Sequence, residues 1–170
     1  MRYIMRFFVL MPLFFCLLTV SALAADQGEL TDQIQNVFDQ AAAGFVARDV
    51  TAVLAFATPE TTLTYRDGST LSMKQWGEAV AKEFADWRDV SSTFTVEKAW
   101  ATGANQAGAV YTEQHQFSRN SDPGHTFVIS ARFEAELLKT AEGWRFLKFT
   151  ELDDTRQTRD GQPLTKPSTP

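Results

Sequence analysis

Apolar residues follow a helical period in three segments of the chain. Between residues 30 and 46 they recur every three or four positions, which predicts an amphipathic helix. Asp49 is a suitable N-cap for a second, short helix over residues 50–56, and Ser72 is suitable for a third helix. The predicted apolar faces consist of Leu30, Ile34, Val37, Phe38, Ala41, Phe45 and Val46 in the first helix, and of Met73, Trp76, Val80, Phe84 and Trp87 in the third.

After residue 90 the apolar period changes to two, which is typical of strands with one buried face. Four long strands are predicted, joined by short turns, and a strand pair around Asp67-Gly68 precedes the third helix. Short connections favour antiparallel neighbours. The predicted fold class is therefore α+β, with a curved antiparallel sheet wrapped around three helices and a conical cavity between them. The four strands cover approximately residues 92–100, 106–119, 126–139 and 144–152.

The first 24 residues have the pattern of a secretory signal peptide. Two arginines precede a long apolar run that ends in Ala22-Leu23-Ala24, so cleavage is predicted after Ala24. An uncleaved membrane anchor is the alternative, because the run approaches the ~20 residues that span a bilayer. The small residues before the cleavage position favour removal, which predicts a periplasmic or secreted protein. Cys16, the single cysteine, lies in this segment, so the mature chain would have no thiol chemistry and no disulfide.

The remaining chain is predicted to form one domain over residues 25–153, followed by a polar tail over residues 154–170 that is mostly disordered. The full chain has a formal net charge of −5, and loss of the signal arginines would make it more negative. An acidic chain without a basic run is a poor nucleic-acid ligand, because neutralising phosphates supplies most of that affinity. No nucleic-acid partner is expected, and no membrane contact after signal removal.

The candidate chemistry lies in VYTEQHQF, residues 110–117. Tyr111, Glu113 and His115 share one strand face, which Ala107, Ala109 and Phe117 extend and which we expect to be concave. On the functional reading, His115 is a general acid or base and Glu113 orients it or a substrate.

The structural alternative is a cross-strand charge pair of Glu113 and His115 with Arg132 or Lys148, worth a few tenths to ~1 kcal/mol. Lys148 is also a candidate pocket cation for an acidic ligand. The predicted ligand-binding set is thus Tyr111, Glu113, His115 and Lys148. No metal site is predicted, since the two histidines are far apart in the sequence.

Two stretches, GFVARDVTAVLAFATPETTLTYRDGSTLSMKQW at 44–76 and AEGWRFLKFTEL at 141–152, resemble the nuclear-transport-factor-2-like superfamily, which includes ketosteroid isomerases and SnoaL-like polyketide cyclases. The resemblance extends over residues 27–153. It implies a cone-shaped pocket, a possible homodimer through the outer sheet face, and no cofactor. Its isomerase-like members carry a helix tyrosine, whereas the first helix here has Phe38 and Phe45, and the only tyrosines after the signal segment are Tyr65 and Tyr111.

Two functions remain open. The first is an exported binding or accessory domain of the SnoaL-like type, with a small apolar ligand and no complete catalytic set. The alternative is a cofactor-free cyclase, dehydratase or isomerase that uses His115 and Glu113 as acid–base residues. The placement of these two side chains, in an enclosed cavity or on the open sheet face, distinguishes the two.

Overall fold

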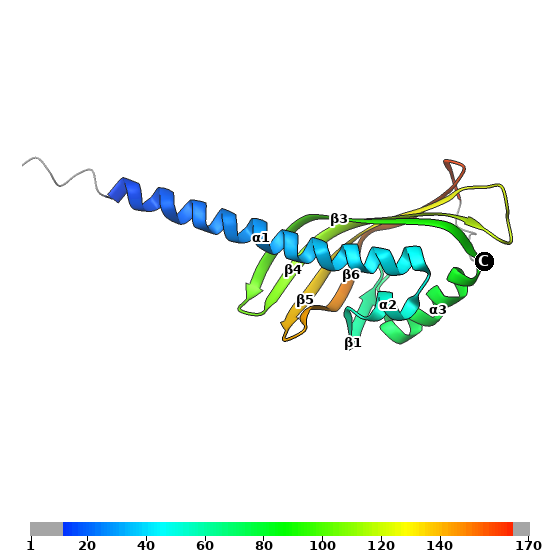
Figure 1. Cartoon of the computed structure of the whole chain (residues 1–170), viewed down its shortest axis with the longest axis horizontal. Helices are drawn as coiled ribbons and strands as arrows, with labels where there is room; N and C mark the ends of the chain where they lie inside the picture. Colours follow the sequence, from blue (N-terminus) through cyan, green and yellow to red (C-terminus); the bar gives the residue numbers. More distant parts are fainter. Residues whose placement is uncertain (1–11, 165–170) are drawn as a thin grey trace, which may run out of the picture.

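The computed structural model describes the backbone of residues 12–164 and the side chains of residues 27–164. The predicted α+β class is confirmed: three helices lie against a curved, unclosed sheet (Figure 1). The elements are α1 (Pro12–Ala47), α2 (Val50–Leu54), β1 (Ala57–Thr64), β2 (Thr70–Ser72), α3 (Met73–Asp86), β3 (Trp87–Gly103), β4 (Gln106–Arg119), β5 (Phe127–Thr140), β6 (Gly143–Arg159) and β7 (Gln162–Pro163).

The sheet has the strand order β2-β1-β6-β5-β4-β3, with β7 paired to the end of β6. All neighbours are antiparallel except β1 and β6, which run parallel. The short connections predicted antiparallel pairs throughout, but β1 and β6 are far apart in the sequence, so their direction is not set by a turn. The ladder between β4 and β5 has no register shift, whereas the β3–β4 and β5–β6 ladders each contain three.

The predicted domain end at residue 153 is wrong. Strand β6 continues to Arg159, and Phe127 at the start of β5 pairs with Arg159. The segment is polar because main-chain hydrogen bonds to β5, rather than a buried apolar face, hold it in the sheet. Residues 165–170 of the predicted tail lie outside the described residues.

Helix α1 begins before the predicted domain start and runs without a break through the predicted cleavage position (Figure 1). The first 11 residues of the predicted signal peptide lie outside the described part of the chain. Within that part, no helix combines the length and apolar character needed to cross a membrane.

Both predicted helix caps are present. The Asp49 carboxylate accepts a hydrogen bond from the Ala52 N–H at 3.1 Å, and α2 ends at Leu54, two residues earlier than predicted. Ser72 and Gln75 form a reciprocal capping box at the start of α3. Such caps satisfy N–H groups that have no partner inside the helix, so these two residues fix where the helices begin.

Helix α1 also covers the β3 edge of the sheet. Among the described residues, β3 pairs with β4 alone. The Gln35 side chain donates to the Phe94 carbonyl at 2.8 Å and accepts from the Val96 N–H at 2.8 Å. One amide therefore pairs both a donor and an acceptor of the edge strand, as a neighbouring strand would.

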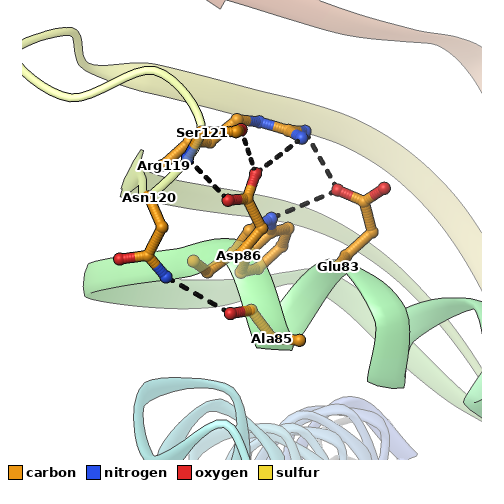
Figure 2. A network of polar contacts seen from close by, with 7 residues as sticks. Glu83, Ala85, Asp86, Arg119, Asn120 and Ser121 are labelled. Carbon is orange, nitrogen blue, oxygen red and sulfur yellow. Dashed lines mark hydrogen bonds and ion pairs between the residues drawn. The ribbon is translucent and has the colours of Figure 1, made fainter.

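A polar network ties the C-terminal end of β4 and the loop after it to α3 (Figure 2). Asp86 accepts hydrogen bonds from the backbone N–H and the hydroxyl of Ser121, and Arg119 contacts Glu83 at 2.9 Å and Asp86 at 3.5 Å. Asn120 donates to the Ala85 carbonyl at 3.2 Å. The loop after β4 is thus fastened to the C-terminal end of α3.

Candidate functional site

A cavity of about 80 Å³ lies inside the cone, between the helices and the concave sheet face. Helix α1, strand β4 and the helix α3 all contribute to its wall. Ten of the lining residues are buried, whereas Leu54, Ala57, Trp76, Glu113 and Phe149 are only partly buried. We infer that a molecule would enter past these five residues. The lining residues are Phe38, Ala41, Phe45, Val53, Leu54, Ala57, Leu63, Met73, Trp76, Phe94, Tyr111, Glu113, Phe133, Phe146 and Phe149.

The side chains on the concave face of β4 are those that the alternation predicts. Tyr111 and His115 are both 3% exposed, and Glu113 lies between them with 19% of its side chain exposed. Tyr111 and Glu113 line the cavity, but His115 does not. The ring of His115 instead stacks on Phe45, with a centroid distance of 4.3 Å.

The imidazole of His115 lies between the hydroxyl of Ser92 and the carboxylate of Glu113. Its Nδ1 is 2.9 Å from the Ser92 hydroxyl, and its Nε2 is 3.7 Å from the Glu113 Oε1. The hydrogen bond to Ser92 and the stacking on Phe45 fix the orientation of the imidazole. His115 therefore lies behind Glu113, and the ring of Phe45 separates it from most of the cavity.

Tyr111 places a phenol at the cavity wall. Its burial raises the pKa of the Tyr111 hydroxyl well above the ordinary value, and the nearby Glu113 carboxylate adds to this shift. The phenol therefore stays protonated and can donate a hydrogen bond. Its ring centroid is 4.2 Å from that of Phe38, so the strand supplies a phenol opposite the phenylalanine of the first helix.

A second tyrosine, Tyr65, lies near the same carboxylate. Partial burial raises the pKa of the Tyr65 hydroxyl, and the charges of Glu151, Glu113 and Asp67 raise it further. Tyr65 follows the end of β1, beside the cavity wall to which Leu63 belongs. The surroundings of this phenol are thus negatively charged.

Lys148, which was predicted to belong to the ligand-binding set, lies outside the lining of the cavity. Its ammonium is 3.5 Å from the Glu136 carboxylate, and its side chain is 44% exposed. The ladder between β5 and β6 shifts register between Glu136 and Leu137, and this bulge turns Lys148 to the outer face with Glu136.

The cross-strand pairs proposed as the structural alternative for Glu113 and His115 are also not formed. Arg132 contacts Glu97 at 2.8 Å on the outer face, and also lies 3.7 Å from Asp153. Glu113 and His115 point to the concave side of the sheet, whereas Arg132 of β5 points to the outer side. They cannot form an ion pair with Arg132, because alternate residues of a strand point to opposite sides.

The cavity residues that the sequence did not identify come mainly from the helices and from β6. Phe38 and Phe45 were recognised as apolar helix positions, but nothing in their spacing shows that they face empty space. Phe146 and Phe149 both line the cavity, although a strict alternation would place them on opposite faces. The bulge in β6 brings them to one side, and a bulge has no reliable sequence signal.

Comparison with known proteins identifies the fold. No protein-family profile and no curated protein sequence matches the chain. Among solved structures, a nuclear transport factor 2-like superfamily protein from Salmonella enterica is 16% identical, with a TM-score of 0.57, over 74% of this chain and 91% of that one. A ketosteroid isomerase-like protein from Erwinia carotovora is 15% identical, with a TM-score of 0.56, over 73% of this chain and 97% of that one.

A putative scytalone dehydratase from Novosphingobium aromaticivorans has a TM-score of 0.62 at 8% identity, over 75% of this chain and 83% of that one. The chain therefore has the nuclear-transport-factor-2-like cone fold. Its aromatic cavity occupies the interior of that cone, with Glu113 and Tyr111 as the polar side chains in the wall.

Proposed function

We propose that the protein binds a small, mostly apolar molecule inside the cone, with the polar or charged group of that molecule against Glu113. One observation carries this proposal: a carboxylate lines a cavity whose other lining residues are apolar or aromatic. A carboxylate in such a place costs solvation energy and contributes little to packing. Groups of this kind are retained where they contact a ligand.

The ligand is compact. At about 80 Å³ the cavity is well below the ~300–1,000 Å³ of typical ligand pockets. Most of its lining side chains are also buried and packed against one another. A molecule with roughly the bulk of one ring or one branched alkyl group fits without displacing the core.

Replacement of Ala41 by leucine is expected to abolish binding. Ala41 lies on the buried face of α1 and lines the cavity, so three added heavy atoms would fill it. We use phenol as the probe, because it combines one ring with one hydroxyl that can donate to Glu113. Saturation-transfer NMR should detect phenol on the wild type and not on the variant, while the melting temperature of the variant stays equal or rises.

Ala43→Leu is the matched control, because Ala43 is on the same helix but exposed. It should leave the phenol signal unchanged. The proposal fails if phenol does not bind the wild type, or if binding persists in Ala41→Leu.

A second candidate function is proton abstraction from a carbonyl compound. It is favoured by the adjacency of a base, Glu113, and a protonated donor, Tyr111, in one cavity wall. The carboxylate would take the proton next to the carbonyl, and the phenol would donate a hydrogen bond to the enolate oxygen. His115 does not line the cavity and would not contact the substrate.

Exchange of the carbon-bound protons of butanone in D₂O tests this second function. The wild type should accelerate exchange over buffer, and Glu113→Gln should lose about 100-fold of that acceleration or more, since it has no base. Glu134→Gln, on the outer face of β5, should exchange butanone like the wild type. Exchange at the rate of buffer in the wild type would exclude this function and leave the binding role intact.

A further inference from the structure

The cavity wall is mainly built of aromatic rings. Of the fifteen lining residues eight are aromatic, and they come from helices α1 and α3 and from four strands. The set is Phe38, Phe45, Trp76, Phe94, Tyr111, Phe133, Phe146 and Phe149. A wall of this composition is not simply apolar, because every aromatic face carries a negative electrostatic potential.

Several neighbouring rings are tilted, whereas the pairs Phe38–Phe94 and Tyr111–Phe133 are stacked, each at 23°. Phe38 lies at 39° to Tyr111 and at 47° to Phe146, with centroid distances of 4.2 and 5.0 Å, and Phe146 lies at 43° to Phe149. A ring face that no neighbouring ring covers attracts a cation that enters the cavity.

The charges around the cavity have the same sign. Glu113 is its carboxylate, and none of the lining residues in the described part of the chain is a lysine, an arginine or a histidine. The imidazole of His115 lies behind this carboxylate, with its Nε2 3.7 Å from the Glu113 Oε1, outside hydrogen-bond distance. Glu151 and Asp67 add negative charge beside Tyr65, and the full chain carries a net charge of −5.

We propose, on the basis of the binding role above, that the ligand of this cavity is a compact alkylated ammonium ion. Ring faces and a carboxylate both attract a cation, and quaternary ammonium groups are recognised by such aromatic cages. An anion would meet Glu113 and the ring faces without any compensating positive charge. A neutral apolar molecule gains only from packing.

The degree of alkylation follows from the polar groups in the wall. Each N–H of a primary ammonium needs an acceptor once it leaves water, and an unpaired one costs about 1–3 kcal/mol. Among the lining side chains, only the two Glu113 oxygens, the Tyr111 hydroxyl and, weakly, the Met73 sulfur can accept, and the rest of the wall is apolar or aromatic. A trimethyl- or tetramethylammonium group has at most one N–H, and its methyl groups pack on the rings.

Calorimetric or NMR titration with three probes of similar size tests the proposal: tetramethylammonium, neutral tert-butanol and anionic trimethylacetate. Tetramethylammonium should bind at least tenfold more tightly than tert-butanol, and trimethylacetate should bind most weakly. Glu113→Gln should weaken tetramethylammonium binding at least tenfold, and should weaken tert-butanol binding by a smaller factor, because the hydroxyl of tert-butanol can still donate to the glutamine amide oxygen. Glu134→Gln removes one carboxylate from the outer face, and should change neither.

The outcomes separate this inference from the binding role itself. If tert-butanol binds, Ala41→Leu blocks it, and tetramethylammonium binds no more tightly, the cation inference is overturned and the binding role stands. If Glu113→Gln and Glu134→Gln weaken tetramethylammonium equally, recognition by Glu113 is overturned. If none of the three probes and no phenol binds, the binding role is overturned as well.

Discussion

Phe38→Ala is expected to lower the free energy of unfolding by about 3–5 kcal/mol, the range found for deletion of a buried aromatic side chain. Phe38 is 1% exposed, and its ring contacts those of Phe94, Tyr111 and Phe146. Its removal would delete the ring contacts of α1 with three strands of the sheet at once. The space left by the ring would enlarge the existing cavity. Urea unfolding followed by tryptophan fluorescence measures the change.

Two variants serve as controls for Phe38→Ala. Gln40→Ala, two positions along the helix and exposed, should change the unfolding free energy by no more than about 0.5 kcal/mol. Phe38→Leu should cost less than the alanine variant, because it leaves a smaller void. A loss below 1 kcal/mol in Phe38→Ala would show that α1 is not held to the sheet through this side chain.

Gln35→Leu is the second substitution with a large expected effect, about 2 kcal/mol of lost stability. It removes the amide that pairs the Phe94 carbonyl and the Val96 N–H, and an unpaired buried polar group costs about 1–3 kcal/mol. The site is part-buried, so water would satisfy some of the loss. Amide hydrogen exchange at Val96 should accelerate together with the drop in unfolding free energy.

Gln35→Glu distinguishes pairing from packing at this position. A carboxylate still accepts from the Val96 N–H, but it cannot donate to the Phe94 carbonyl and it would face the Asp39 carboxylate, to which the Gln35 amide donates at 2.7 Å. Gln35→Glu should therefore also be less stable than the wild type, although it keeps the length of the side chain. If Gln35→Leu is as stable as the wild type, the apolar contact of α1 with β3 suffices to cover the sheet edge.

The helices were the most predictable part of the fold, because period and cap agree. Asp49 and Ser72 mark the starts of α2 and α3 with local hydrogen bonds. Such hydrogen bonds depend only on residues that are close in the sequence, so the sequence predicts them. The parallel pairing of β1 with β6 and the extension of β6 to Arg159 were not predictable in this way. Both depend on which distant strand edge is available, and the polar sequence at 154–159 carries no apolar pattern.

The site was predicted in part. Alternation along β4 placed Tyr111, Glu113 and His115 on the concave face, and the structure has them there. It could not tell that Phe45 would stand between His115 and the cavity, because that depends on how α1 packs across the sheet. Lys148 lies on the outer face because one extra residue in β6 reverses the side to which it points.

The unshifted β4–β5 ladder has a consequence for how this pocket can diversify. Twelve consecutive residue pairs, from Gln106↔Leu138 to Phe117↔Phe127, keep one spacing, and Glu113 and Tyr111 sit within them. Slippage by a single residue would turn both outward, so their strand tolerates neither insertion nor deletion. The opposite wall, built from α2 and α3, carries no such restriction. New specificities would therefore arise by substitution of side chains such as Trp76 and Leu54, while the position of the Glu113 carboxylate stays fixed.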